Sequence, residues 1–139
     1  MFNPSRDQAR QFLIEAWQKR RNAAPATPLE VLAADLIEQH PEYHAELEAP
    51  DALSREWTPE QGESNPFLHL SLHLAIEEQL SIDQPPGIRA AFEQLQSRTD
   101  RHEAQHAVLD CLGETIWRAQ RDRTGPDGAA YLDCIRRKL

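Results

Sequence analysis

The chain of 139 residues contains few cysteines, glycines and aromatic residues. It contains two cysteines and five glycines, and aromatic residues make up 6% of it. Two cysteines, Cys111 and Cys134, are too few for a disulfide scaffold, so we expect both to be small buried residues in a reducing cytoplasm. The five glycines and ten prolines act as local breaks and do not form a low-complexity segment.

Basic residues and long apolar runs are scarce as well. The formal net charge of −8 argues against a nucleic-acid partner, because phosphate binding needs a basic surface. No apolar run approaches the ~18 residues of a membrane span, and the first residues, MFNPSRDQAR, lack the apolar core of a signal peptide. We expect a cytoplasmic protein with no membrane partner. The sequence leaves a protein partner open.

The apolar pattern predicts helices throughout. Asn3-Pro4, Thr27-Pro28 and Asn65-Pro66 are start signals in which proline takes the first helical position. No segment shows the alternation of a strand, and the residues at 49–64 have no helical period and predict a surface loop. The predicted fold is all-α, a bundle of four main helices plus shorter ones in a single domain over residues 1–139. The expected helices are 4–22, 28–40, 66–82, 88–98, 101–122 and 127–137.

All six histidines fall in three pairs spaced four residues apart. The pairs are His40 with His44, His69 with His73, and His102 with His106. Residues i and i+4 lie on one face of a helix, so two such imidazoles can share one metal ion. In the helix expected over 66–82, both histidines lie within the apolar arc.

Short connections predict that helices 66–82 and 101–122 run parallel, which brings their histidine pairs to one level. We therefore predict one metal site with His69, His73, His102 and His106 as ligands. Glu77 and Asp110, each four residues beyond a pair, are expected as further ligands or as partners of the ring N–H groups. His40 and His44 are candidate additional ligands, with capping or surface exposure as the alternative. Neutral imidazole suits zinc, iron or nickel, which the sequence does not separate.

Two alternatives stay open at this point. The segment His102 to His106, HEAQH, matches the H-E-x-x-H signature of zinc hydrolases, in which Glu103 would be the general base. A peptidase also needs a third ligand and a strand edge, and neither is apparent in the sequence. The second alternative is a metal-free helical adaptor whose histidines are structural or respond to pH.

The segments GESNPFLHLSLHLAIEEQLSIDQPPGIR and HEAQHAVLDCLGETIWRAQR, with HPEYH upstream, resemble a family of small bacterial proteins described only as a domain of unknown function. This resemblance covers nearly the whole chain and implies a bacterial cytosolic protein, with no activity attached. More loosely, histidine pairs on parallel helices look like those of hemerythrin-like bundles and of metal-dependent thiol-transferase bundles. The chain lacks the full hemerythrin ligand order.

Overall fold

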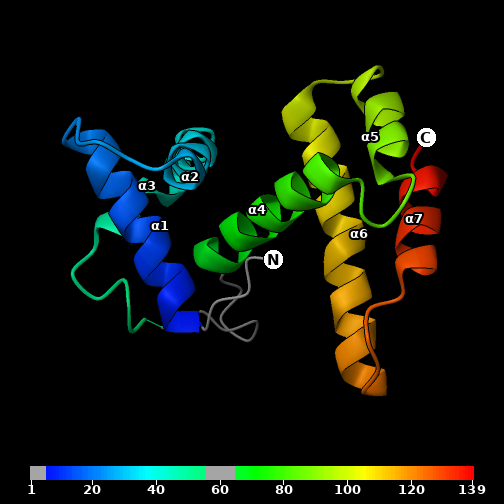
Figure 1. Ribbon diagram of the computed structural model, residues 1–139. Coiled ribbons are helices and arrows are strands. Elements are labelled where there is room, and N and C mark those ends of the chain that lie inside the picture. The colour runs from blue at the N-terminus through cyan, green and yellow to red at the C-terminus, as the bar shows by residue number, and fades with distance from the viewer. Residues whose placement is uncertain (1–5, 56–64) are drawn as a thin grey trace. The chain divides into compact units, whose positions relative to one another are not determined.

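The computed structural model describes residues 6–55 and 65–139 (Figure 1). Over these residues the chain is helical and contains no strand, which confirms the all-α prediction. None of the helices there has the length and apolar character needed to cross a membrane. The elements are α1 (Arg6–Arg21), α2 (Pro28–Glu38), the 3₁₀ helix η1 (Pro41–Tyr43), α3 (His44–Glu48), α4 (Pro66–Ile82), α5 (Ile88–Gln96), α6 (Arg101–Asp122) and α7 (Gly128–Arg137).

The chain divides into two compact units, Met1–Leu74 and Ala75–Leu139. Helix α4 begins in the first unit and ends in the second. The single domain over 1–139 and the arrangement as four main helices stay predictions.

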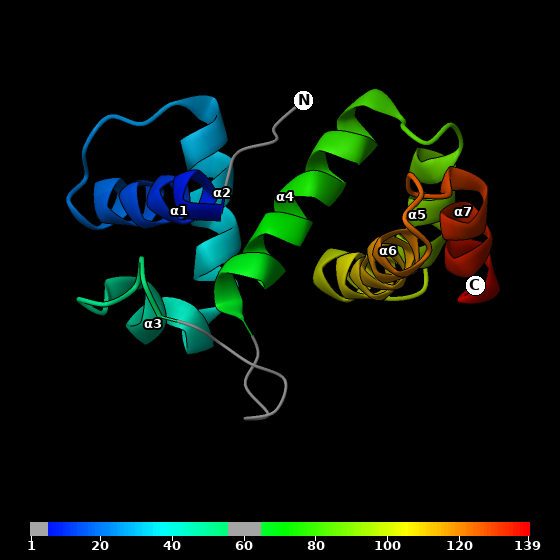
Figure 2. The ribbon, with the colours of Figure 1, turned by 90° about the horizontal axis from the view of Figure 1, so that it is seen from below.

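The first unit is built on the packing of α1 against α2, with α3 also in contact with α1 (Figures 1 and 2). Its core is a cluster of side chains that are nearly inaccessible to solvent. Burial of such side chains is the main favourable term in folding. The cluster includes Leu13, Trp17, Leu36, Ile37, Leu47, Phe67 and Leu70.

Two of the expected helix starts can be checked, and both are confirmed. Thr27 and Glu30 form a capping box at the start of α2, in which the Glu30 N–H donates to the Thr27 hydroxyl and the Thr27 N–H donates to Glu30. The Asn65 side-chain oxygen accepts from the N–H groups of Phe67 and Leu68 at the start of α4. The expected cap at Asn3 lies outside the described residues.

In the second unit α6 packs against both α5 and α7. Apolar side chains from the three helices are buried, among them Phe92, Val108 and Ile135. The Tyr131 hydroxyl of α7 donates to the Gln79 side chain at 2.7 Å, and burial raises the pKa of Tyr131 well above its usual value. Tyr131 is therefore a neutral, hydrogen-bonded core residue.

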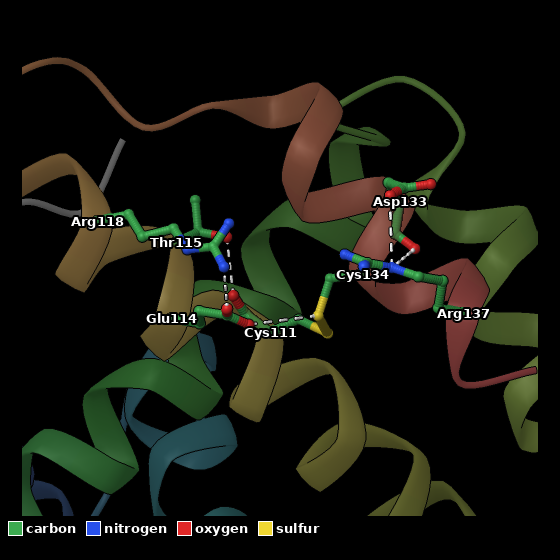
Figure 3. Close-up of a disulfide and its surroundings, with 7 residues drawn as sticks. All are labelled: Cys111, Glu114, Thr115, Arg118, Asp133, Cys134 and Arg137. Atoms are coloured by element: carbon green, nitrogen blue, oxygen red, sulfur yellow. Dashed lines mark hydrogen bonds and ion pairs between the residues drawn. A yellow bond between two sulfur atoms is a disulfide. The ribbon is translucent and has the colours of Figure 1, made fainter.

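The prediction for the two cysteines is wrong in two respects. Cys111 is buried as expected, but Cys134 is only partly buried, and the two are bonded to each other, so α6 and α7 are joined by a disulfide (Figure 3). The pairing depends on how α7 folds back against α6, which the surroundings of each cysteine in the sequence do not reveal. The disulfide also removes the argument for a reducing compartment, which rested on cysteine usage.

Glu30 makes the first unit's stability depend on pH. The Lys19 ammonium, 2.7 Å away, and the Thr27 N–H lower the pKa of Glu30. Because the pKa of Glu30 is lower in the folded than in the unfolded protein, the ionised carboxylate stabilises the fold at any pH above the unfolded pKa of about 4.3. This stability is lost as the pH falls through the folded-state pKa. Glu30→Gln should lower the melting temperature at pH 7, and the difference should shrink below about pH 4. Glu15→Gln, an exposed change on α1, is the control. A difference that stays constant from pH 7 to pH 3 would contradict the assignment.

A candidate metal centre in the first unit

His40 owes its orientation to the proline that follows it. Pro41 disfavours helical geometry at the preceding residue, and His40 accordingly leaves the helical region with φ −127° and ψ 65°. Its N–H donates to the Ile37 carbonyl at 3.0 Å, and not to the Leu36 carbonyl as a continued α-helix would require. The His40 ring instead makes the contact with the Leu36 carbonyl, and its Nδ1 atom lies 2.7 Å from the Leu36 oxygen.

This contact fixes which nitrogen of His40 carries the proton. A carbonyl oxygen only accepts hydrogen bonds, so Nδ1 is the N–H and donates. In the neutral ring Nε2 is then left with the lone pair. The His40 side chain is buried, with 1% of its surface exposed, so its Nε2 is directed into the protein. A backbone carbonyl that accepts a hydrogen bond from one ring nitrogen in this way is typical of histidines that bind a metal through the other nitrogen.

His69 and His73 stand on successive turns near the start of α4. Their i,i+4 spacing places both rings on one face, with ring centroids 4.8 Å apart. His73 is fully buried.

The three rings converge through their Nε2 atoms. His69 Nε2 is 3.2 Å from His40 Nε2 and 3.2 Å from His73 Nε2. One ligand atom from each ring lies within 4.8 Å of the others. Two nitrogens bound to one ion at 2.0–2.1 Å with tetrahedral angles would be about 3.3 Å apart. The two 3.2 Å separations at His69 therefore match those of ligands that share one ion.

Two arrangements fit the contacts at His69. Each imidazole nitrogen has a single in-plane position, which holds either a proton or a lone pair. In the first arrangement a proton on His69 Nε2 is shared between lone pairs on His40 and His73. In the second, all three nitrogens present lone pairs and a cation binds among them. The second arrangement is the one that a metal site requires.

The surroundings of this three-histidine cluster are aromatic and apolar. The Tyr43 ring stacks parallel to His40 at 5.5 Å and meets His69 edge-on at 5.6 Å. Burial, followed by the negative charges of Glu42 and Glu46, raises the pKa of Tyr43, so its hydroxyl is neutral at physiological pH. Such a shell restricts the ring orientations of the histidines.

The other residues predicted for the site have identifiable surroundings. The His44 Nε2 donates to the Ile37 carbonyl at 2.9 Å and thereby caps α2. Glu77, in the second unit, accepts from Arg101 at 2.9 and 3.0 Å and from the Gln105 side chain. Asp110 is exposed on α6. The roles of Glu77 and Asp110 as ligands or orienting partners stay predictions.

His102 and His106 lie close together on α6, with ring centroids 4.2 Å apart. This follows from their i,i+4 spacing within the second unit. Glu103 between them is exposed, and its N–H donates to the Asp100 side chain at 2.8 Å as part of the helix start. The expectation that this pair completes the site with His69 and His73 stays a prediction.

From the sequence, His40 was predicted only as a candidate additional ligand. The signal that could have raised it is Pro41, because a proline directly after a histidine ends the helix there and frees a carbonyl for the ring. The spacing rule joined His40 to His44, whereas the structure joins it to His69 and His73.

Comparison with known proteins gives one match. The model of a family described as "Domain of unknown function (DUF1841)" matches residues 5–137. No curated protein and no solved structure matches the chain.

The tautomer of His40 can be tested directly. In metal-free protein labelled with ¹⁵N, the His40 side chain should show the Nδ1-protonated form. Pro41→Ala should allow α2 to continue, return the Leu36 carbonyl to a backbone N–H and remove this preference. Pro28→Ala, at the other end of the same helix, is the matched control and should leave the His40 signals unchanged. An Nε2-protonated His40 in the parent would contradict the geometry.

Proposed function

We propose that this chain, which belongs to the family of unknown function DUF1841, is a transition-metal-binding helical protein whose ion is held by His40, His69 and His73. The observation that carries this proposal is the convergence of three ring nitrogens, with His69 Nε2 3.2 Å from both His40 Nε2 and His73 Nε2, close to the spacing of nitrogens that share one ion. In the adaptor alternative the same contacts would be hydrogen bonds among the three rings, with no ion bound.

The donor set narrows the class of metal. The three side chains are imidazoles, and carboxylate is not part of the cluster. Calcium, magnesium and manganese prefer oxygen ligands, whereas zinc, nickel, copper and iron accept imidazole. An all-imidazole set of ligands near tetrahedral separation favours zinc among these, with nickel and iron as the other metals to be tested.

A fourth ligand would complete a tetrahedral shell. The pairing of histidines in the sequence predicts His106 as a ligand, and its side chain is half-buried on α6 of the second unit. With a fourth histidine the shell is closed, as in structural zinc sites. With water in that position the ion would lower the pKa of the water and could activate it for hydrolysis. We include His106 in the proposed shell.

The ligand assignment predicts the effect of single substitutions on metal binding. The purified untagged protein should bind about one equivalent of zinc. His40→Ala, His69→Ala and His73→Ala should each weaken binding by more than the about 10–100-fold that follows the loss of an outer-shell partner. His44→Ala removes a neighbouring histidine that caps α2 and should keep the parent affinity. Competition titration with a chromogenic chelator measures all four. Equal affinities across the series would rule out the cluster.

His106 has its own test. His106→Ala should lower the zinc affinity at least about tenfold if it fills the fourth position. His102→Ala, on the same face one turn earlier, provides the comparison. Cobalt substitution gives an independent measurement, because tetrahedral cobalt absorbs visible light strongly and six-coordinate cobalt does not. A spectrum that is identical in parent and His106→Ala protein would remove His106 from the shell.

Metal binding should also stabilise the fold. A ligand that binds only the folded state adds about 2.7 kcal/mol when its free concentration is one hundred times its dissociation constant. For a chain of this size, this corresponds to a rise of several degrees in melting temperature. Adding chelator should reverse the rise in the parent and have no effect in His73→Ala. A parent melting curve that does not respond to zinc or chelator would favour the metal-free adaptor.

A further inference from the structure

The disulfide in the second unit borders a cleft that can admit a small molecule. The cleft has a volume of about 250 Å³ and is lined by residues of α6, the following loop and α7, with Cys134 among them. In Figure 3 the Cys134 sulfur lies beside Cys111, and Glu114, Thr115 and Arg118 of α6 are close by. The structure therefore places one half of a cystine next to a space open to solvent.

The two sulfurs differ in their accessibility. Cys111 is fully buried, whereas Cys134 is partly exposed and lines the cleft. Thiol–disulfide exchange requires a thiolate to reach the sulfur that it attacks. Attack from the cleft is therefore directed to Cys134, and Cys111 is the leaving group.

Charged groups of both signs surround this cleft. Arg118, Arg121 and Arg137 line it together with Glu114, Asp122 and Asp127. The arginines are held in ion pairs between exposed groups, such as Arg118 with Glu114 at 2.6 Å. Exposed pairs of this kind contribute little, so a ligand's own carboxylate or ammonium group can replace one partner at small cost. The cleft suits a molecule that carries both charges.

We propose that the Cys111–Cys134 disulfide is an exchange site for a low-molecular-weight peptide thiol bearing carboxylate and ammonium groups. The thiolate of the ligand attacks the Cys134 sulfur and forms a mixed disulfide with it. The Cys111–Cys134 bond breaks, its electron pair remains on Cys111, and that sulfur takes a proton from water. A second thiol releases Cys134, so two thiols become one small disulfide while the protein cystine becomes two thiols.

Glu114 adds a feature specific to the reduced state. Its Oε2 atom lies 4.0 Å from the Cys134 sulfur. A disulfide sulfur has no proton to donate, whereas the reduced Cys134 thiol has one and can donate it to this carboxylate. The carboxylate also opposes formation of a thiolate at Cys134, which slows the reverse attack. Glu114 thus favours the opened form once it has been made.

The test exposes the full-length oxidised protein to reduced glutathione and, separately, to neutral 2-mercaptoethanol. Reaction is stopped with acid, and the adducts are located by peptide mass spectrometry. We expect a glutathione adduct on Cys134 in native buffer. Arg118→Gln should slow its formation roughly 2- to 5-fold, the range that one exposed ion pair represents. The rate with 2-mercaptoethanol should be unchanged by this substitution.

Arg136→Gln is the matched control, because it makes the same charge change on α7 at a residue that does not line the cleft. It should leave both rates as in the parent. Glu114→Gln should speed the closing of the reduced protein to the disulfide. The proposal is overturned if adducts form only after unfolding in urea, if they appear on Cys111, or if Arg118→Gln changes both thiol rates alike. None of these readouts depends on the metal site.

Discussion

A single in-plane position on each imidazole nitrogen is the constraint on which the candidate site depends. The Leu36 carbonyl occupies that position on His40 Nδ1, which leaves Nε2 as a lone-pair donor. His69 and His73 bring two further Nε2 atoms to the same place at 3.2 Å separations. One cation at that place can bind all three. The metal proposal therefore rests on the positions of the three nitrogens rather than on the number of histidines.

Local signals predicted the helices well, because each signal acts within a few residues. Asn65 and Asp100 cap α4 and α6, and those helices run over 66–82 and 101–122 as expected. The His69–His73 contact was predictable for the same reason, since i,i+4 spacing on a helix guarantees it. His40 could not be joined to this pair from the sequence, because 29 residues separate it from His69 and the connection depends on how α2 meets α4.

The disulfide is a second contact that local sequence signals could not predict. Cys111 lies on the buried side of α6, and burial was expected for it. Its bond to Cys134 requires α7 to return along α6 at one particular register. Two cysteines are too few to stabilise a whole domain as a disulfide scaffold. Two cysteines are enough, however, for one disulfide that joins two neighbouring helices beside an open cleft.

His69–His73 and His102–His106 have the same spacing and nearly the same ring separations, 4.8 and 4.2 Å. Spacing alone therefore does not identify a metal site, because the second pair consists of two tilted, half-buried rings. What distinguishes the first pair is a third ring, that of His40, whose tautomer is set by a carbonyl that α2 no longer uses. Pro41 is the residue that ends α2. For the proposed site, a histidine directly before a helix-ending proline is thus a stronger indicator of a ligand than the His40–His44 spacing.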